Sequence, residues 1–300
     1  MNRRNFLSGS IAFGLLLTQS KSLKSGILSS VSDNVKMPVY SEKTKKKFSD
    51  IIKKAQKNNW NTLTIGECIG EIGKEFIGIP YAGGTLEAEG QELCRINFEV
   101  LDCVTFFENT LCLARIIKKE KTDFQDLTDE ITFTRYRNGK ITDYTSRLHY
   151  TADWIYDNSK KKTIFDVTNK LGGRARKFEV SYMSTHYERY DALVSNRILV
   201  PVIAETEKEI NSRVYYTIKK EKIKTSEAHF KTGDIVAITS NVAGLDYAHT
   251  GLIYKKNGKS LFMHASSSNK KVIIDCTISE YVRRKSYPAE ITILRPLSLV

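Results

Sequence analysis

Apolar residues in the N-terminal third of the chain recur every three or four positions, as in an amphipathic helix. They stand at Phe48, Ile51, Ile52 and Ala55, and again at Ile69, Ile72 and Phe76. Ser41 precedes the first segment, and Thr64 with Glu67 resembles a capping box before the second. The pattern predicts two helices, with the folded domain beginning near Glu42.

The last seventy residues carry strand patterns instead. Short β-rich runs bounded by Gly, Asn and Ser predict strands over 234–239, 247–254, 261–265, 271–274 and 291–294. Such closely spaced strands indicate an antiparallel sheet or barrel. Residues 123–227 mix helix and strand signals and stay unassigned. Because no repeat or interdomain linker is visible, we expect one α+β domain with insertions over residues 42–300.

A third helix is predicted to begin near Leu101, because apolar residues recur at helical spacing from Val104 through Leu111. Cys103 falls in its first turn, where backbone N–H groups and the helix dipole stabilise a thiolate. Two readings of Cys103 alone remain open, a reactive nucleophile and a small buried core residue. Cys112, on the same helix, is expected to be a core residue.

Two histidines lie on either side of Asn257-Gly258, a strong signal for a two-residue hairpin turn. With that turn at the centre, Gly251 faces His264, and His249 lies diagonally from His264 on the same face of the sheet. Gly251 leaves room for the His264 ring. Cysteine catalysis needs a thiolate, a base and a group that orients the base. Cys103, His249 and His264 are candidates for these three roles.

The N-terminus predicts export. Arg3 and Arg4 precede an apolar run that is too short to span a bilayer, followed by polar residues. Residues 1–22 therefore resemble a signal peptide of the twin-arginine type, and the Ser-rich residues 23–41 read as a linker. No later run predicts a membrane anchor, so we expect a protein exported to the periplasm or the medium.

Charge and cysteine content limit the expected partners and disulfides. The net charge of +13 is spread along the chain, and no zinc finger, basic zipper or RNP motif accompanies it, so nucleic acid is not an expected partner. Five cysteines, without a CxxC pair or zinc spacing, exclude a complete disulfide framework and favour at least one free thiol. Any disulfide among Cys68, Cys94, Cys112 and Cys276 stays open.

These motifs resemble the NlpC/P60 branch of papain-like cysteine peptidases, which carries Asp-Cys at a helix start, a strand histidine and a third polar residue one strand later. The matching segments here are Asp102-Cys103, His249 to Tyr254, His264-Ala265-Ser266 and, upstream, Gly78 to Gly84. The chain is more similar still to the N-acetylmuramoyl-L-alanine amidase-like family of that superfamily (DUF1460), over about residues 69–296. Its matching segments are 102–106, 135–139, 149–150, 153–154, 233–234 and 264–266.

The resemblance implies a papain-like core and hydrolysis of the amide between N-acetylmuramic acid and L-Ala in peptidoglycan fragments, without metal or other cofactor. It implies Cys103 as nucleophile, His249 as base, His264 as orienting group and the Tyr81 hydroxyl as an oxyanion donor, although Tyr81 also fits a core aromatic. Candidate substrate-binding residues are Asp102, His149, Tyr150, Asp153, Trp154, Arg135 and Arg137. For the last two, a solvated strand edge is the competing reading, and for His149 and Asp153 a buried structural pair.

Three other functions remain in play. Related endopeptidases cleave γ-D-glutamyl-diamino acid bonds and usually read Asp-Cys-Ser, whereas Val104 follows the cysteine here. An inactive muropeptide-binding module would keep the fold without turnover, and a basic nucleic-acid binder would be retained on DNA in a salt-dependent way. We expect a monomer that acts on soluble muropeptides.

Overall fold

The computed structural model describes residues 37–297. The predicted leader, 1–22, lies outside the described residues, as does most of the predicted linker. The last linker residues are described, and the main chain of Val39 forms hydrogen bonds with Cys94 and Ile96. Contacts with the body of the domain therefore begin slightly before Glu42.

Helices and a large antiparallel sheet make up the described chain. The longer helices are α1 (Glu42–Lys57), α2 (Ile65–Glu75), α3 (Cys103–Lys118), α4 (Phe124–Arg135), α5 (Thr151–Lys160) and α8 (Leu199–Ser212). The shorter ones are α6 (Tyr182–Thr185), α7 (Asp191–Ser195), α9 (Ile223–Ser226) and α10 (Ile278–Arg283). Ser41 caps α1, and Thr64 with Glu67 forms the expected capping box of α2. The first three predicted helices are thus confirmed.

Six strands form the main sheet in the order β1-β8-β4-β5-β6-β7, with every neighbouring pair antiparallel. They are β1 (Ile164–Asp166), β4 (Ile235–Thr239), β5 (Tyr247–Lys256), β6 (Lys259–Ser266), β7 (Lys271–Thr277) and β8 (Ile291–Pro296). β2 (Arg174–Arg176) and β3 (Tyr215–Thr217) form a separate ribbon. The five predicted strands are confirmed as β4 to β8. Within the described residues, they form an open sheet together with β1, and β1 and β7 lie at its edges.

The hairpin between β5 and β6 has the predicted register. Lys256 pairs with Lys259 and Leu252 with Met263. Asn257 and Gly258 both have positive φ, as a two-residue turn of this handedness requires. This turn fixes which residues share a face of the sheet.

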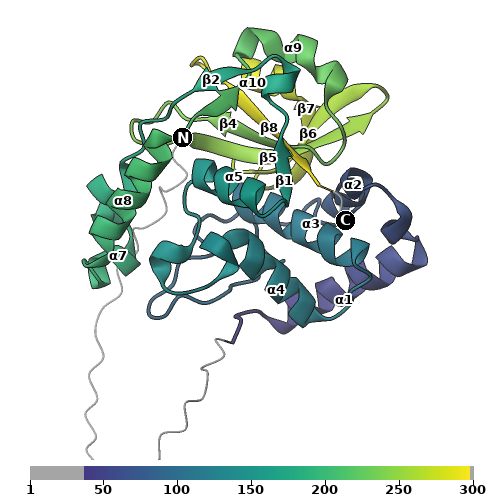
Figure 1. The fold of residues 1–300 in the computed structure, drawn as a ribbon. Coiled ribbons are helices and arrows are strands. Elements are labelled where there is room, and N and C mark those ends of the chain that lie inside the picture. Colours follow the sequence, from purple (N-terminus) through teal and green to yellow (C-terminus); the bar gives the residue numbers. More distant parts are fainter. Residues whose placement is uncertain (1–36, 298–300) are drawn as a thin grey trace, which may run out of the picture.

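The two faces of the sheet are covered by separate hydrophobic cores. Ile235, Leu252 and Met263 point into the larger core with α1 to α5, whereas Val236, Ile253 and Phe262 point into a smaller core with α10. Figure 1 shows this arrangement, with the N-terminal helices on one side of the sheet and α9 and α10 on the other. Helix α3 is buried on nearly all sides, between α2, α4 and strands β5 and β6.

A β-bulge interrupts the pairing of β4 with β5. Ile238 pairs with His249, but the next residue, Thr239, pairs with Tyr247, so Ala248 is the extra residue. Bulges of this kind redirect side chains. Tyr247 turns into the larger core, and His249 stays on the opposite face beside Phe262.

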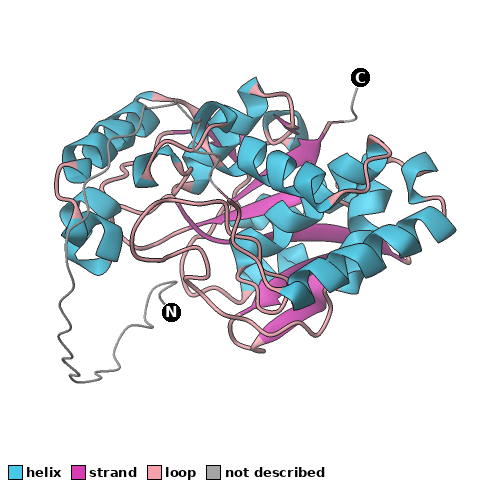
Figure 2. Cartoon of the chain, turned by 90° about the horizontal axis from the view of Figure 1, so that it is seen from below, coloured by secondary structure: helices cyan, strands magenta, loops and turns pink. Residues whose placement is uncertain are grey.

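The unassigned middle of the chain supplies α4 to α9 and β1 to β3. Several of these elements have only three to five residues, too few for a clear period, and tertiary contacts decide their conformation. Figure 2 shows the molecule from below, with loops running between the helices and the strands.

Gly251 is the position at which the hairpin tolerates no side chain. A Cβ there would lie 2.6 Å from Phe262 Cε2, 2.7 Å from the Met263 carbonyl oxygen and 2.8 Å from His264 Cβ. We therefore expect Gly251→Ala to lower the free energy of unfolding by about 1–3 kcal/mol through overpacking, measured by urea denaturation. Exposed Lys259→Ala on the same hairpin is the control, and equal stability of the two variants would contradict the close packing.

Candidate active site

Asp102 caps α3 and so positions Cys103 at its first residue. The Asp102 carboxylate accepts hydrogen bonds from the Val104 and Thr105 N–H groups at 3.0 and 2.7 Å. In return, the Asp102 N–H donates to Thr105 Oγ1 at 2.9 Å. Cys103 is 2% exposed. The sequence predicted this placement of the cysteine, whereas the Asp102 carboxylate, predicted to bind substrate, is engaged in the cap.

Two contacts attach the start of α3 to the sheet. Thr250 Oγ1 on β5 donates to the Cys103 carbonyl oxygen at 2.8 Å, and Thr250 directly follows His249. On the other side, residues 78–82 bridge β7 and the residue before the cap, since Tyr81 N–H donates to the Lys270 carbonyl and Leu101 N–H to the Pro80 carbonyl. The Tyr81 ring packs, half-buried, against the larger core.

The two predicted histidines form a direct pair. His249 Nε2 and His264 Nδ1 are 2.7 Å apart, and their rings meet edge to face. His264 is 1% exposed, and its Nε2 faces the Asp275 carboxylate at 3.7 Å, too far for a good hydrogen bond. Burial lowers the pKa of His264 to about 4, although Asp275 opposes this shift. His264 is therefore neutral at neutral pH.

The carboxylate also determines the hydrogen-bonding direction of the pair. A neutral imidazole carries one proton, and Asp275 favours that proton on Nε2 of His264. We therefore assign His264 Nδ1 as acceptor of the His249 Nε2–H. This tautomer leaves Nδ1 of His249 as the basic nitrogen of the pair.

Tyr281 of α10 also belongs to the site and was missed from the sequence. Its ring stacks on His249 with centroids 5.9 Å apart and meets His264 edge to face at 5.1 Å. Burial raises the pKa of the Tyr281 hydroxyl, and the negative charge of a Cys103 thiolate raises it further. Tyr281 therefore lies near the thiol, and its ring contacts both imidazoles.

Sequence signals existed for one of the two missed residues. The predicted β7 strand stopped at residue 274, but β7 continues to Thr277 and includes Asp275. His264 pairs with Ile273, so strand alternation places Asp275 on the same face as His264. Tyr281 gave no such signal, because its helix has only six residues.

Four predicted substrate-binding residues are buried and bonded to other side chains of the domain, and their contact with substrate stays a prediction. Trp154 is 2% exposed, and its indole N–H donates to Glu108 at 3.1 Å, while Arg135 donates to the same carboxylate at 2.6 Å. Arg135 ends α4 and is buried, so the competing reading of a solvated strand edge is wrong. Glu108, Arg135 and Trp154 form an internal ion network, in which an unpaired charge would be costly.

The other two buried residues join α5 to its surroundings. Asp153 binds Arg137 at 2.7 Å and Arg213 at 2.8 Å, and the Tyr150 hydroxyl donates to Glu207 at 2.6 Å. The competing reading of an Asp153 pair with His149 is wrong as well, because the His149 ring contacts Tyr144 and its carbonyl oxygen. Of the seven predicted residues, His149, Arg137 and Asp102 keep partial exposure.

The remaining cysteines form no disulfide in the described residues, and one of them, Cys276, lies at the edge of the site beside Asp275. Burial raises the pKa of Cys68 to about 12 and that of Cys276 to about 11, and it also raises the pKa of Cys94 and Cys112. None of these four is suited to nucleophilic attack at neutral pH.

Within residues 37–297, no group of three or more His, Cys, Asp or Glu side chains is arranged to hold a metal ion. No helix in this range combines the length and apolar character that a membrane span needs.

Fold and site together define an α+β protein with a cysteine-bearing helix attached to a histidine-bearing sheet. The model of the N-acetylmuramoyl-L-alanine amidase-like family matches residues 71–291, and the chain belongs to this family. The comparison with curated proteins gives no match.

Solved structures agree with this assignment. An N-acetylmuramoyl-L-alanine amidase from Bacteroides uniformis is 33% identical, with a TM-score of 0.72 over 77% of this chain and 98% of its own. A Bacteroides fragilis protein named as a candidate xylanase is also 33% identical, with a TM-score of 0.69 over 75% of this chain and 99% of its own. A Legionella pneumophila protein assigned to DUF1460 shares the fold at 20% identity, with a TM-score of 0.62 over 84% and 95% of the two chains.

The low pKa of His264 predicts acid sensitivity of the fold. Between pH 6.5 and about 4 the unfolded chain binds a proton that folded His264 does not, so stability is lost as the pH falls through this range. Between pH 7 and pH 4, we expect the free energy of unfolding of the wild type to fall by about 3 kcal/mol more than that of His264→Gln. Urea denaturation at each pH measures this difference. The variant His229→Gln, at an exposed position, is the control and should keep the wild-type dependence of unfolding free energy on pH. The same dependence in His264→Gln would contradict a lowered pKa of His264.

The contacts of Tyr281 predict that its ring holds His249 in place. We expect Tyr281→Leu to slow alkylation of Cys103 by iodoacetamide about 10-fold to 100-fold at neutral pH, because His249, the predicted base, is displaced from its position. Peptide mass spectrometry measures this rate for each cysteine separately. Tyr281→Phe keeps the ring and should react nearly as wild type, and Tyr156→Leu, on exposed α5 surface, is the control. Wild-type rates in Tyr281→Leu would rule out a positioning role.

Proposed function

We propose that this protein is a cysteine amidase with a papain-like NlpC/P60 core, which hydrolyses the bond between N-acetylmuramic acid and L-Ala in peptidoglycan fragments. One observation carries the proposal. The start of α3, with Cys103, is hydrogen-bonded to β5 beside His249, and His249 is held by His264. Membership of the amidase-like family supports the choice of substrate.

The reaction is an acyl transfer in two steps. His249 Nδ1 takes the proton of Cys103, and the thiolate forms an S–C bond to the lactyl carbonyl carbon. The C–N bond then breaks, and the imidazolium of His249 gives its proton to the departing L-Ala nitrogen. Water, deprotonated by His249, hydrolyses the thioester, releases the lactyl carboxylic acid and restores the thiol.

His264 and Asp275 stabilise the charge that His249 gains. His264 is neutral, and its Nδ1 accepts the His249 Nε2–H, so it fixes the ring without competing for the proton. The Asp275 carboxylate lies on the far side of His264. For the oxyanion, we assign the Cys103 N–H at the helix start and the Tyr81 hydroxyl as donors.

The residue after the nucleophile favours the amidase over the endopeptidase. Val104 is half-buried against the larger core and offers no hydroxyl to a free L-Ala amine. The endopeptidase and the inactive binding module remain as outcomes of the test below.

The cellular setting is part of the same proposal. Export to the periplasm or the medium rests on residues 1–22, and one catalytic domain over residues 42–300 would act there on soluble muropeptides as a monomer. The proposal includes neither a nucleic-acid partner nor a membrane anchor.

Mass spectrometry of a defined muropeptide tests the function. We expect wild type to release an intact stem peptide, and Cys103→Ala to lose about 10⁴-fold or more of the turnover with its fold retained, because the nucleophile is removed. Cys68→Ala, in α2, is the matched control and should keep its activity.

Each alternative has its own outcome in this experiment. A shortened stem peptide would identify the endopeptidase, and bound but uncleaved substrate would identify the binding module. Full turnover by Cys103→Ala would reject the cysteine mechanism.

A further inference from the structure

A basic pocket of about 440 Å³ lies between the β2-β3 ribbon, the end of β4 and the loop before β8. Four cations line it, Arg174, Arg176, Lys219 and Lys220, against two carboxylates, Glu221 and Glu290. The net charge of these six side chains is therefore +2. No residue predicted from the sequence lies among its lining residues.

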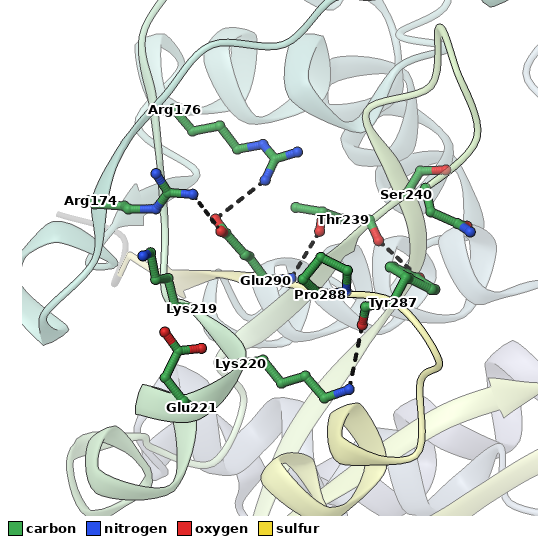
Figure 3. Close-up of a pocket in the computed structure, with 11 residues that line it drawn as sticks. Arg174, Arg176, Lys219, Lys220, Glu221, Thr239, Ser240, Tyr287, Pro288 and Glu290 are labelled. Atoms are coloured by element: carbon green, nitrogen blue, oxygen red, sulfur yellow. Dashed lines mark hydrogen bonds and ion pairs between the residues drawn. The ribbon is translucent and has the colours of Figure 1, made fainter.

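Glu290 holds the two arginines in a defined arrangement. Arg174 and Arg176 alternate on β2, and both point toward the Glu290 carboxylate, with N···O distances of 2.7 and 3.3 Å (Figure 3). Thr217 Oγ1 also donates to this carboxylate. Burial raises the pKa of Glu290, but hydrogen bonds from Arg174 and Thr217 lower it, and the net shift is downward. Glu290 thus stays ionised and orients the guanidinium groups.

Capacity for a second anion remains in the pocket. The Arg174 side chain is 55% exposed, and a guanidinium has five N–H donors in a fixed fork suited to carboxylates. Arg176 Nε is buried without a hydrogen-bond partner among the described residues. Lys220 has another task, because its ammonium group donates to the carbonyl oxygens of Lys285 and Tyr287 and so holds the loop.

The pocket adjoins the candidate active site through Tyr287. This residue lines the pocket, and its hydroxyl donates to the Thr239 carbonyl at 3.0 Å, one residue beyond the β4 partner of His249. The Tyr287 hydroxyl also raises the pKa of Tyr281, which stacks on His249, so the two tyrosines are near neighbours. Lys285, in the same loop, has its ammonium group 4.6 Å from the centre of the Tyr281 ring.

We propose, building on the function above, that this pocket binds carboxylate groups of the stem peptide on the leaving-group side of the scissile amide. An extended peptide advances about 3.3–3.6 Å per residue, so carboxylates of the second and third stem residues lie roughly 7–11 Å from the bond. Two arginines oriented by an internal carboxylate match such groups. The pocket would make a longer acidic stem a better substrate than L-Ala alone.

Two substrates and two single variants test this subsite. The substrates are N-acetylmuramoyl-L-Ala and N-acetylmuramoyl-L-Ala-γ-D-Glu-diaminopimelate, and the variants are Arg174→Gln and Lys219→Gln. Both variants leave Arg176 paired with Glu290, which protects the fold. We expect KM for the tripeptide substrate to rise about tenfold in Arg174→Gln with kcat unchanged, and KM for the short substrate to stay constant. Arg189→Gln, outside the pocket, is the matched control.

A binding measurement separates this proposal from the catalytic one. Calorimetry of the free tripeptide with Cys103→Ala should give a Kd that weakens about tenfold when Arg174→Gln is added, and more steeply at low salt. If wild type cleaves neither substrate but this dependence on Arg174 holds, the catalytic proposal fails and the subsite stands. If Arg174→Gln and Lys219→Gln change neither KM nor Kd, or change both substrates equally, the subsite is refuted.

Discussion

The hydrogen bond from Thr250 Oγ1 to the Cys103 carbonyl oxygen joins two parts of the chain that are 147 positions apart. The rest of the site depends on it, because the thiol belongs to a helix and the imidazoles belong to a sheet. Helix α3 is buried among α2, α4 and the sheet, so it has little freedom to slide. The cap at Asp102 fixes its first turn, and the bridge through Tyr81 connects the residue before the cap to β7.

Much of this arrangement is visible in the sequence, for local reasons. Spacing and capping predicted α1, α2 and α3, and the Asn257-Gly258 turn predicted both the hairpin register and the shared face of His249 and His264. Each of these signals relates residues at most 15 positions apart in the sequence. The family resemblance added the substrate class, which no local pattern contains.

The rest could not be predicted because it depends on long-range contacts. Arg135 and Trp154 carry the composition of a ligand-binding surface, yet both are used by Glu108 inside the domain. Tyr281 and the Arg174-Arg176 pocket reach their neighbours from short elements whose conformation is set by packing. A motif shows which residues occur together, but the fold decides which partners their side chains bind.

The imidazoles and the sulfur come from distant parts of the chain, so partial unfolding affects them differently. The imidazole pair is contained in one hairpin, only 15 positions apart, whereas the sulfur reaches it solely through docking of a distant helix. A perturbation that loosens the helix would separate sulfur from imidazole while the hairpin persists, since local contacts cost less loop entropy than distant ones. The reactivity of the site is therefore a more sensitive measure of the packing of α3 on the sheet than secondary-structure content is. On gentle heating, this reactivity would be lost first.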